Sequence, residues 1–194
     1  ADSLADMAVL PIRITGDRVL HTRADEVTAF DRELRTLVAE MFDTMDEAPG
    51  VGLAGPQVGV PLRLFVYGWT DDDEVLHRGV AINPVLWQSP LETGPLDEDA
   101  ECEGCLSFPG ERFPLRRAER VILQAVDLEG APFEVRTEGW LARIFQHECD
   151  HLEGVLYVDR LGHPFGKQAL KTQRKNSWGV PGLSWLPGRD HLED

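Results

Sequence analysis

Apolar side chains recur at spacings of three and four between residues 31 and 46, which predicts an amphipathic helix. The members of this stripe are Leu34, Leu37, Val38, Met41, Phe42 and Met45. Asp31 is a suitable N-cap, and Pro49-Gly50 ends the segment. Helical spacing returns over residues 138–152 and stops at Gly154, which predicts a second helix.

Period-two alternation predicts strands elsewhere. Over residues 61–67, Leu62, Leu64 and Val66 alternate with Arg63, Phe65 and Tyr67. Residues 80–87, 121–128 and 133–135 are also typical of strands, with a turn at 130–132. Because helices and strands are mixed without regular alternation, we expect a single α+β domain with antiparallel or mixed sheets around the second helix.

Two stretches depart from this pattern. Residues 92–103 are strongly acidic, which predicts a solvated loop. Beyond residue 161 the chain is rich in glycine, proline and polar groups. We therefore expect the functional domain to span residues 1–161, followed by a partly extended or mobile C-terminal tail over residues 162–194.

The charge, the lengths of the apolar runs and the number of cysteines argue against several classes of function. The 194 residues carry a formal net charge of −15, which disfavours nucleic acid or an anionic membrane as the main partner. No apolar run approaches the ~20 residues that span a bilayer, and Asp2 and Asp6 stand where a secretory signal is positively charged. Three cysteines are too few, and odd in number, for a disulfide framework. We expect a cytoplasmic protein with reduced thiols.

The segment His147-Glu148-Cys149-Asp150-His151 is an HExxH sequence within the second predicted helix. Residues four apart share a helical face, so His147 and His151 can bind one metal ion. Glu148, rotated by about 100° around the axis, can take a proton from a water on that ion without being a ligand. The alternative is two surface histidines on a charged helix. Cys149 points away from this face and is expected to be a small core residue.

A catalytic metal site needs a third protein ligand. The metzincin pattern places a histidine at position 157, where this chain has Tyr157. A thermolysin-like downstream glutamate fits poorly, since Glu193 is the only glutamate beyond Glu153. The third ligand is therefore expected upstream, where Cys102 and Cys105 are the soft donors, and spacing alone does not choose between them.

The C-x-x-C pair, Cys102 and Cys105, allows two other interpretations. A four-thiolate structural zinc site is excluded, because the chain has no second C-x-x-C. Neighbouring glutamates would raise a thiol's pKa, the reverse of what a redox cysteine needs. One thiolate completing a His-His-Cys site accounts better for the pattern, and it leaves a fourth position open for water, as catalytic sites do.

Residues 50–59 match G-x-G-x-x-G, but a helix precedes them and a strand follows, the reverse of a dinucleotide fingerprint. A tight turn would explain the glycines. Gln57 adds an amide that can donate to a developing oxyanion, and glycine-rich backbone can pair with an extended peptide.

Three segments, GVGLAGPQ at 50–57, EGCLS at 103–107 and QHECDH at 146–151, together resemble the peptide deformylase family. The similarity in pattern extends over roughly residues 9–161. One departure is Gly55, where the family usually has alanine; added backbone freedom there is expected to loosen the loop that holds Gln57.

The resemblance implies roles for individual residues. His147, His151 and Cys105 would bind one divalent metal ion, with Glu148 as general acid/base. Gln57 and the backbone N–H of Leu106 would stabilise the tetrahedral intermediate. The implied reaction removes the formyl group from the N-terminal formyl-methionine of nascent polypeptides and releases formate. The implied physiological ion is Fe(II), with zinc, nickel or cobalt able to substitute.

A substrate pocket is expected beside the predicted metal site. Trp140, Arg143 and Ile144 lie near the face of His147 and, with Val51, would line an apolar pocket for methionine. Gly50 and Gly52 flank Val51 as expected peptide-binding backbone. The alternative is that Trp140 and Ile144 are plain core.

The expected partners are N-formyl-methionyl peptides, with neither a membrane nor a specific nucleic-acid sequence. Lys167, Lys171, Arg174 and Lys175 form a basic patch that is either solvated tail or a transient ribosome contact. Two other functions remain open: an inactive relative that binds peptides, and a metallopeptidase that cleaves ordinary peptide bonds.

Overall fold

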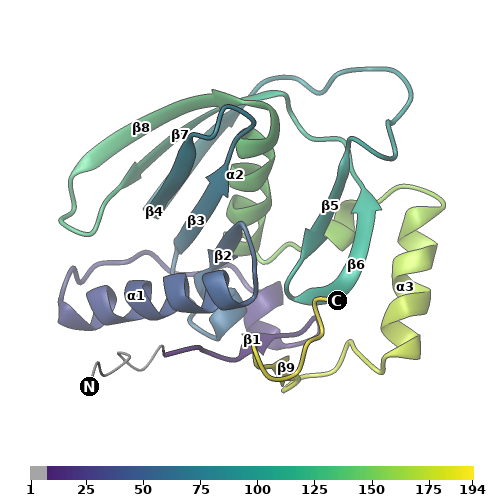
Figure 1. The fold of residues 1–194 in the computed structure, drawn as a ribbon, viewed down its shortest axis with the longest axis horizontal. Helices are drawn as coiled ribbons and strands as arrows, with labels where there is room; N and C mark the ends of the chain where they lie inside the picture. The colour runs from purple at the N-terminus through teal and green to yellow at the C-terminus, as the bar shows by residue number, and fades with distance from the viewer. Residues whose placement is uncertain (1–7) are drawn as a thin grey trace.

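The computed structural model describes residues 8–194 and has the mixed α+β architecture expected from the sequence (Figure 1). Asp2 and Asp6, on which the expectation about a secretory signal rests, lie outside the described residues. The elements in chain order are β1 (Ile12–Arg13), η1 (Arg18–His21), α1 (Arg32–Glu47), β2 (Gly52–Ala54), η2 (Gly55–Val58), β3 (Leu64–Thr70), β4 (Leu76–Gln88), β5 (Cys102–Cys105), β6 (Phe108–Pro114), β7 (Arg120–Val126), β8 (Pro132–Glu138), α2 (Gly139–Leu152), η3 (Tyr157–Arg160), α3 (Phe165–Lys175) and β9 (Ser184–Trp185).

An antiparallel five-stranded sheet, in the order β2-β3-β4-β7-β8, forms the centre of the fold. Side chains alternate across β3, so that Leu64 and Val66 pack in the cluster that includes α1. Phe65 and Tyr67 pack on the opposite face with α2. Both faces of this strand are therefore covered, which explains why all four side chains are apolar.

The two long helices begin and end close to their predicted residues. The Asp31 side chain accepts a hydrogen bond from the N–H of Leu34 at 3.0 Å, which confirms it as the N-cap of α1. The second helix ends at Leu152, and Gly154 follows with φ of +76°. A Cβ at Gly154 would lie 2.8 Å from the backbone of His21, so a larger residue would not fit this turn.

Helix α2 lies between the sheet and a separate hairpin formed by β5 and β6 (Figure 1). The hairpin register is irregular: Cys105 pairs with Phe108, whereas Gly104 pairs with Arg112. Residues 109–111 therefore bulge out of the ladder. Strands β2, β5 and β6 were not predictable from periodicity, because none of their sequences alternates clearly between apolar and polar residues.

Residues 162–194, which we expected to form a partly extended or mobile tail, contain a helix and a paired strand. Residues 165–175 form the helix α3, whose Ala169 is buried, and β9 pairs with β1. Trp185 in β9 is 1% exposed, and its indole N–H donates to the carbonyl of Leu106 at 2.8 Å. Glycine and proline in this region mark turns between packed segments, so the boundary at residue 161 does not separate two independently packed parts.

Among residues 8–194, every helix is too short or too polar to cross a membrane.

We expect Trp185→Ala to lower the free energy of unfolding by about 3–5 kcal/mol, because it removes a buried indole and leaves a cavity. Chemical denaturation measures this change. Trp87→Ala is the matched control, since Trp87 is 52% exposed, and should cost less than about 1 kcal/mol. Equal losses in the two variants would contradict the packing of β9.

Candidate metal and catalytic site

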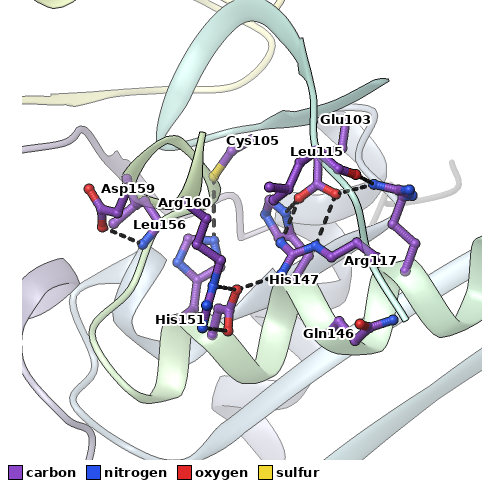
Figure 2. A network of polar contacts seen from close by, with 12 residues as sticks. Glu103, Cys105, Leu115, Arg117, Gln146, His147, His151, Leu156, Asp159 and Arg160 are labelled. Atoms are coloured by element: carbon purple, nitrogen blue, oxygen red, sulfur yellow. Dashed lines mark hydrogen bonds and ion pairs between the residues drawn. The ribbon is translucent and has the colours of Figure 1, made fainter. Parts of the chain in front are cut away.

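Helix α2 presents His147 and His151 on one face, as the four-residue spacing predicts, and β5 brings Cys105 toward them. One ligand atom from each of these three residues lies within 4.8 Å of the others. The Cys105 Sγ lies 3.4 Å from the Nε2 of His151 (Figure 2). Three soft and borderline donors converging in a buried space form a site that fits a single divalent transition metal.

The orientation of both imidazole rings supports this assignment. The Nδ1 of His147 lies 2.9 Å from Glu103 Oε1, which leaves its Nε2 for a metal ion. Burial, together with the neighbouring His147, holds the pKa of His151 well below its usual value. A neutral His151 ring is the form that binds a metal.

Glu103 is the centre of a buried ionic network (Figure 2). Its carboxylate contacts Arg117 at 2.7 Å and Arg143 at 2.8 Å in addition to His147. Burial alone would raise the pKa of Glu103, but the hydrogen bond from His147 and the charge of Arg117 hold it well below its usual range. Arg117 also contacts Asp150 on α2 at 2.7 Å, which ties the β6–β7 connection to the helix.

Glu148 lies beside the three candidate ligands and is 3% exposed. Burial, with the nearby charges of Glu103 and Asp150, raises the pKa of Glu148 to about 7. Its Oε2 has no hydrogen-bond partner within residues 8–194. A Cβ at Gly52 would lie 2.5 Å from Glu148 Oε1, so glycine is needed where this loop approaches the carboxylate.

Gln57 lines the same cavity as Glu148. Its Oε1 accepts a hydrogen bond from the N–H of Ala54 at 2.9 Å, which turns the amide nitrogen outward. That nitrogen lies 3.2 Å from Ser107 Oγ and 3.8 Å from Cys105 Sγ. The amide is thus a fixed donor next to the candidate metal site.

Gly55 is packed closely in η2. A Cβ at this position would lie 2.7 Å from the carbonyl oxygen of Leu62 and 3.0 Å from that of Val60. Glycine therefore allows the loop carrying Gln57 to approach its neighbour, a constraint that the expected loosening did not consider.

A cavity of about 440 Å³ joins these groups. All of the predicted site residues except His151 line it, namely Gly50, Val51, Gly52, Gln57, Cys105, Leu106, Trp140, Arg143, Ile144, His147 and Glu148. His151 is fully buried next to Cys105. The Arg143 guanidinium is committed to Glu103 and to the carbonyl of Leu115 at 2.7 Å.

The other two cysteines stand apart from the three candidate ligands. Cys102 is partly exposed at the start of β5 and is not part of the ligand cluster. Cys149 packs against the core between α2 and the sheet, and burial raises its pKa to about 12.

Sequence reasoning missed three features of this site. Glu103 was assigned to a solvated acidic loop, but it is 3% exposed because Arg117 and Arg143 neutralise it. Two features of the sequence could have indicated that Glu103 is buried. It directly precedes Gly104-Cys105, and the chain carries a pair of arginines at 116–117. Glu193 and Asp194 also line the cavity, and nothing in their local sequence indicates this.

Comparisons with known proteins agree with the geometry. Residues 9–165 match the sequence profile described as polypeptide deformylase. The peptide deformylase of Rhodococcus opacus is 50% identical over 186 residues, covering 94% of this chain and 95% of the relative.

Solved structures give the same result. Peptide deformylase from Thermus thermophilus superposes with a TM-score of 0.73 at 40% identity, covering 86% of this chain and 94% of that one. The class I type b peptide deformylase from Acinetobacter baumannii, solved with Met-Ala-Ser bound, gives a TM-score of 0.70 at 34% identity, covering 80% of this chain and 99% of that one. The extent of these matches, together with a buried Cys-His-His cluster beside a glutamate, shows that the chain belongs to the polypeptide deformylase family.

Proposed function

We propose that residues lining the cavity perform the deformylation reaction in three roles. Three residues bind one metal ion, one is the general acid/base, and two donate hydrogen bonds to the oxyanion. As a member of its family the chain is a metal-dependent hydrolase that removes N-formyl groups from nascent polypeptides. The observation that carries the residue-level proposal is that Cys105, Glu148 and Gln57 converge on one cavity from three different elements.

Cys105, His147 and His151 are the proposed ligands of one divalent ion. An ion held by these three residues would supply Lewis-acid chemistry and lower the pKa of a water molecule. Fe(II) is the proposed physiological ion, with zinc, nickel or cobalt as substitutes, since a thiolate with two imidazoles suits each of them.

Glu148 is the proposed general acid/base. Burial raises the pKa of its carboxyl group, and a group of this kind is suited both to accept a proton from the attacking water and to return it to the leaving amine. Its buried position in the same cavity as His147 and Cys105 supports this role.

Gln57 and the N–H of Leu106 are the proposed donors to the oxyanion that forms when water adds to the formyl carbon. The Ala54 hydrogen bond fixes the Gln57 amide before substrate arrives, and a fixed donor stabilises the transition state without reorganisation.

Val51, Trp140, Ile144 and the stem of Arg143 are proposed to hold the methionine side chain, with the backbone of Gly50 and Gly52 along the peptide. All of them line the cavity beside His147 and Glu148. The Acinetobacter relative binds Met-Ala-Ser, a peptide that begins with methionine, which supports this assignment.

The proposed setting is the cytoplasm, where nascent chains emerge and free thiols persist. Lys167, Lys171 and Arg174 lie together around Leu170 on α3, and all three cations are exposed. We propose a transient ribosome contact through this face, because cations in an otherwise acidic protein can steer it toward RNA.

Glu148→Ala should reduce kcat by several orders of magnitude while metal content stays at about one ion per chain, because the carboxylate moves a proton and binds no metal. Steady-state kinetics on formyl-Met-Ala-Ser and elemental analysis of the purified variant measure the two effects. Loss of the metal together with the activity would assign Glu148 a different role.

The two neighbouring cysteines provide a matched pair. Cys105→Ala should abolish tight metal binding and activity, since two histidines alone form a weak site. Cys102→Ala should retain both, because Cys102 lies outside the ligand cluster. Metal titration of the two variants decides the assignment, which the opposite pattern would reverse.

Formyl-Met-Ala-Ser should exceed formyl-Gly-Ala-Ser in kcat/KM by at least about tenfold, because an apolar pocket gains free energy from the methionine side chain. Competition between the two peptides gives the ratio directly. Equal values would remove the methionine pocket from the proposal.

Reversing the charges with Lys167→Glu/Lys171→Glu should reduce co-sedimentation with ribosomes at low salt. Arg18→Glu/Arg32→Glu is the control, since it changes net charge equally at exposed positions elsewhere. If both pairs sediment like the parent protein, α3 is no ribosome contact.

A further inference from the structure

Strand β8 (Pro132–Glu138) forms an open edge of the five-stranded sheet. It is the last strand in the order β2-β3-β4-β7-β8, and within residues 8–194 only β7 pairs with it. Figure 1 shows β8 as the outermost strand of this sheet. An open edge presents backbone N–H and C=O groups that can pair with a further strand.

The register with β7 identifies which backbone groups point outward. The N–H of Asp127 donates to the carbonyl of Ala131 at 3.0 Å, and that of Gly139 donates to the carbonyl of Glu119 at 3.0 Å. These bonds lie at the two ends of the β7–β8 ladder, and bonded pairs alternate with non-bonded pairs along an antiparallel ladder. The odd-numbered residues of β8 therefore bond to β7, and the backbone groups of the even-numbered residues point to the open edge.

The two faces of β8 differ in chemistry. Glu134 and Arg136 lie on the exposed face and form an ion pair at 2.9 Å. Their side chains are 37% and 70% exposed, so solvent weakens this pair and leaves both charges available. Phe133 and Val135 lie on the other face and are only partly covered by the cluster that includes α2. Each face of the strand thus remains partly open at the edge.

A second copy of β8 matches these positions when the two strands run antiparallel with Val135 opposite itself. Glu134 would then lie opposite the partner's Arg136, and the same pair would recur on the other side of the two-fold axis. On the apolar face the two Val135 side chains would meet, and Phe133 would lie opposite the partner's Thr137. Opposite charges and apolar pairs directly across a ladder stabilise strand pairing.

The backbone fits the same register. Even-numbered residues would lie opposite even-numbered residues, so the groups that are free at each edge are the groups that pair. Pro132 has no N–H and would lie opposite Glu138. Glu138 is the N-cap of α2, and the carbonyl of an N-cap residue accepts the first bond of its helix. The Glu138 N–H can donate to the Pro132 carbonyl, and no other group of this pair needs a partner.

The neighbouring registers are unfavourable. Keeping the free groups opposite each other allows the strands to slip only by two residues. A slip in one direction places Glu134 opposite itself, and a slip in the other places Arg136 opposite itself and Glu134 opposite Glu138. Like charges directly opposite each other destabilise a strand pair. Charges on an edge strand usually prevent pairing, whereas these charges exclude the slipped registers and favour one.

We propose that β8 is a self-association surface through which two copies of this chain form a two-fold symmetric dimer with one continuous antiparallel sheet. The occupant is a second copy because the charges and apolar side chains of β8 are complementary to β8 itself. An isologous contact of this kind closes at two copies. The formal net charge of −15 opposes association, but salt at about 0.15 M screens charges farther apart than about 8 Å.

Sedimentation velocity of the metal-loaded chain at about 0.15 M salt tests this surface. The native chain should pass from monomer to dimer between about 1 and 200 µM. Arg136→Glu and Glu134→Arg each place like charges opposite each other, so each should raise the dimer dissociation constant by at least about tenfold. An equimolar mixture of the two single variants should dimerise again, because every opposed pair then has opposite charges.

Arg18→Glu is the matched control, since it changes the net charge as Arg136→Glu does, at an exposed residue of η1, and should keep the native dissociation constant. Deformylation of formyl-Met-Ala-Ser should be equal in all variants, because no residue of β8 lines the cavity. This activity and circular dichroism confirm that each variant is folded.

A native chain that stays monomeric up to about 200 µM would overturn the proposal and leave the edge to a strand of another protein. An unchanged dissociation constant in either single variant, an equal rise in the Arg18 control, or a mixture that stays monomeric would overturn it as well. Hydrogen exchange provides a second measurement, since the amides of Glu134, Arg136 and Glu138 should become protected as the protein concentration rises.

Discussion

The buried carboxylate of Glu103 links strand β5 to helix α2, the two elements that carry the candidate metal ligands. It lies on β5 yet contacts Arg143 and His147, which both belong to α2. A buried charge is costly unless it is paired and hydrogen-bonded, and this one has three partners. The pairing fixes β5 against the helix, so Cys105 and His147 approach each other and the Nε2 of His147 is left for a metal ion at the candidate site. Arg117 extends the same constraint to Asp150, which Arg160 also contacts at 2.8 Å.

Sequence periodicity predicted the elements whose side chains repeat regularly. Helix α2 and the face that carries His147 and His151 follow from spacings of three and four, and the Asp31 cap follows from local chemistry. The β5–β6 hairpin was not predictable in this way, because a bulge interrupts its register and Cys102–Cys105 shows no apolar alternation. The fold of residues 165–185 was also missed, since the burial of Trp185 depends on β1 and Leu106, which lie far away in the chain.

The candidate site likewise contains residues that local sequence predicts and residues whose position depends on long-range contacts. The three ordered motifs, of which HExxH is one, were sufficient to find part of the cavity lining, because each motif is contiguous. The residues found in this way are Gln57, Cys105, Leu106, His147 and Glu148. Glu103 was read as solvated, since an acidic residue in an acidic stretch is usually exposed. Its burial depends on Arg117 and Arg143, and Arg143 is forty residues away in the sequence. Long-range pairing of this kind leaves no local periodic signal.

The inner and outer parts of the cavity differ in how tightly they are constrained. The inner groups lie on α2, β5 and η2 and share buried partners, so that a change at Arg117 alters Glu103 and Asp150 together. Free-energy effects of substitutions within this network should therefore be strongly non-additive. Glu193 and Asp194 instead approach the cavity through backbone contact at Gly110, without a shared ion pair to the inner groups. A change at the outer end of the cavity consequently leaves the buried ion pairs of the inner groups intact.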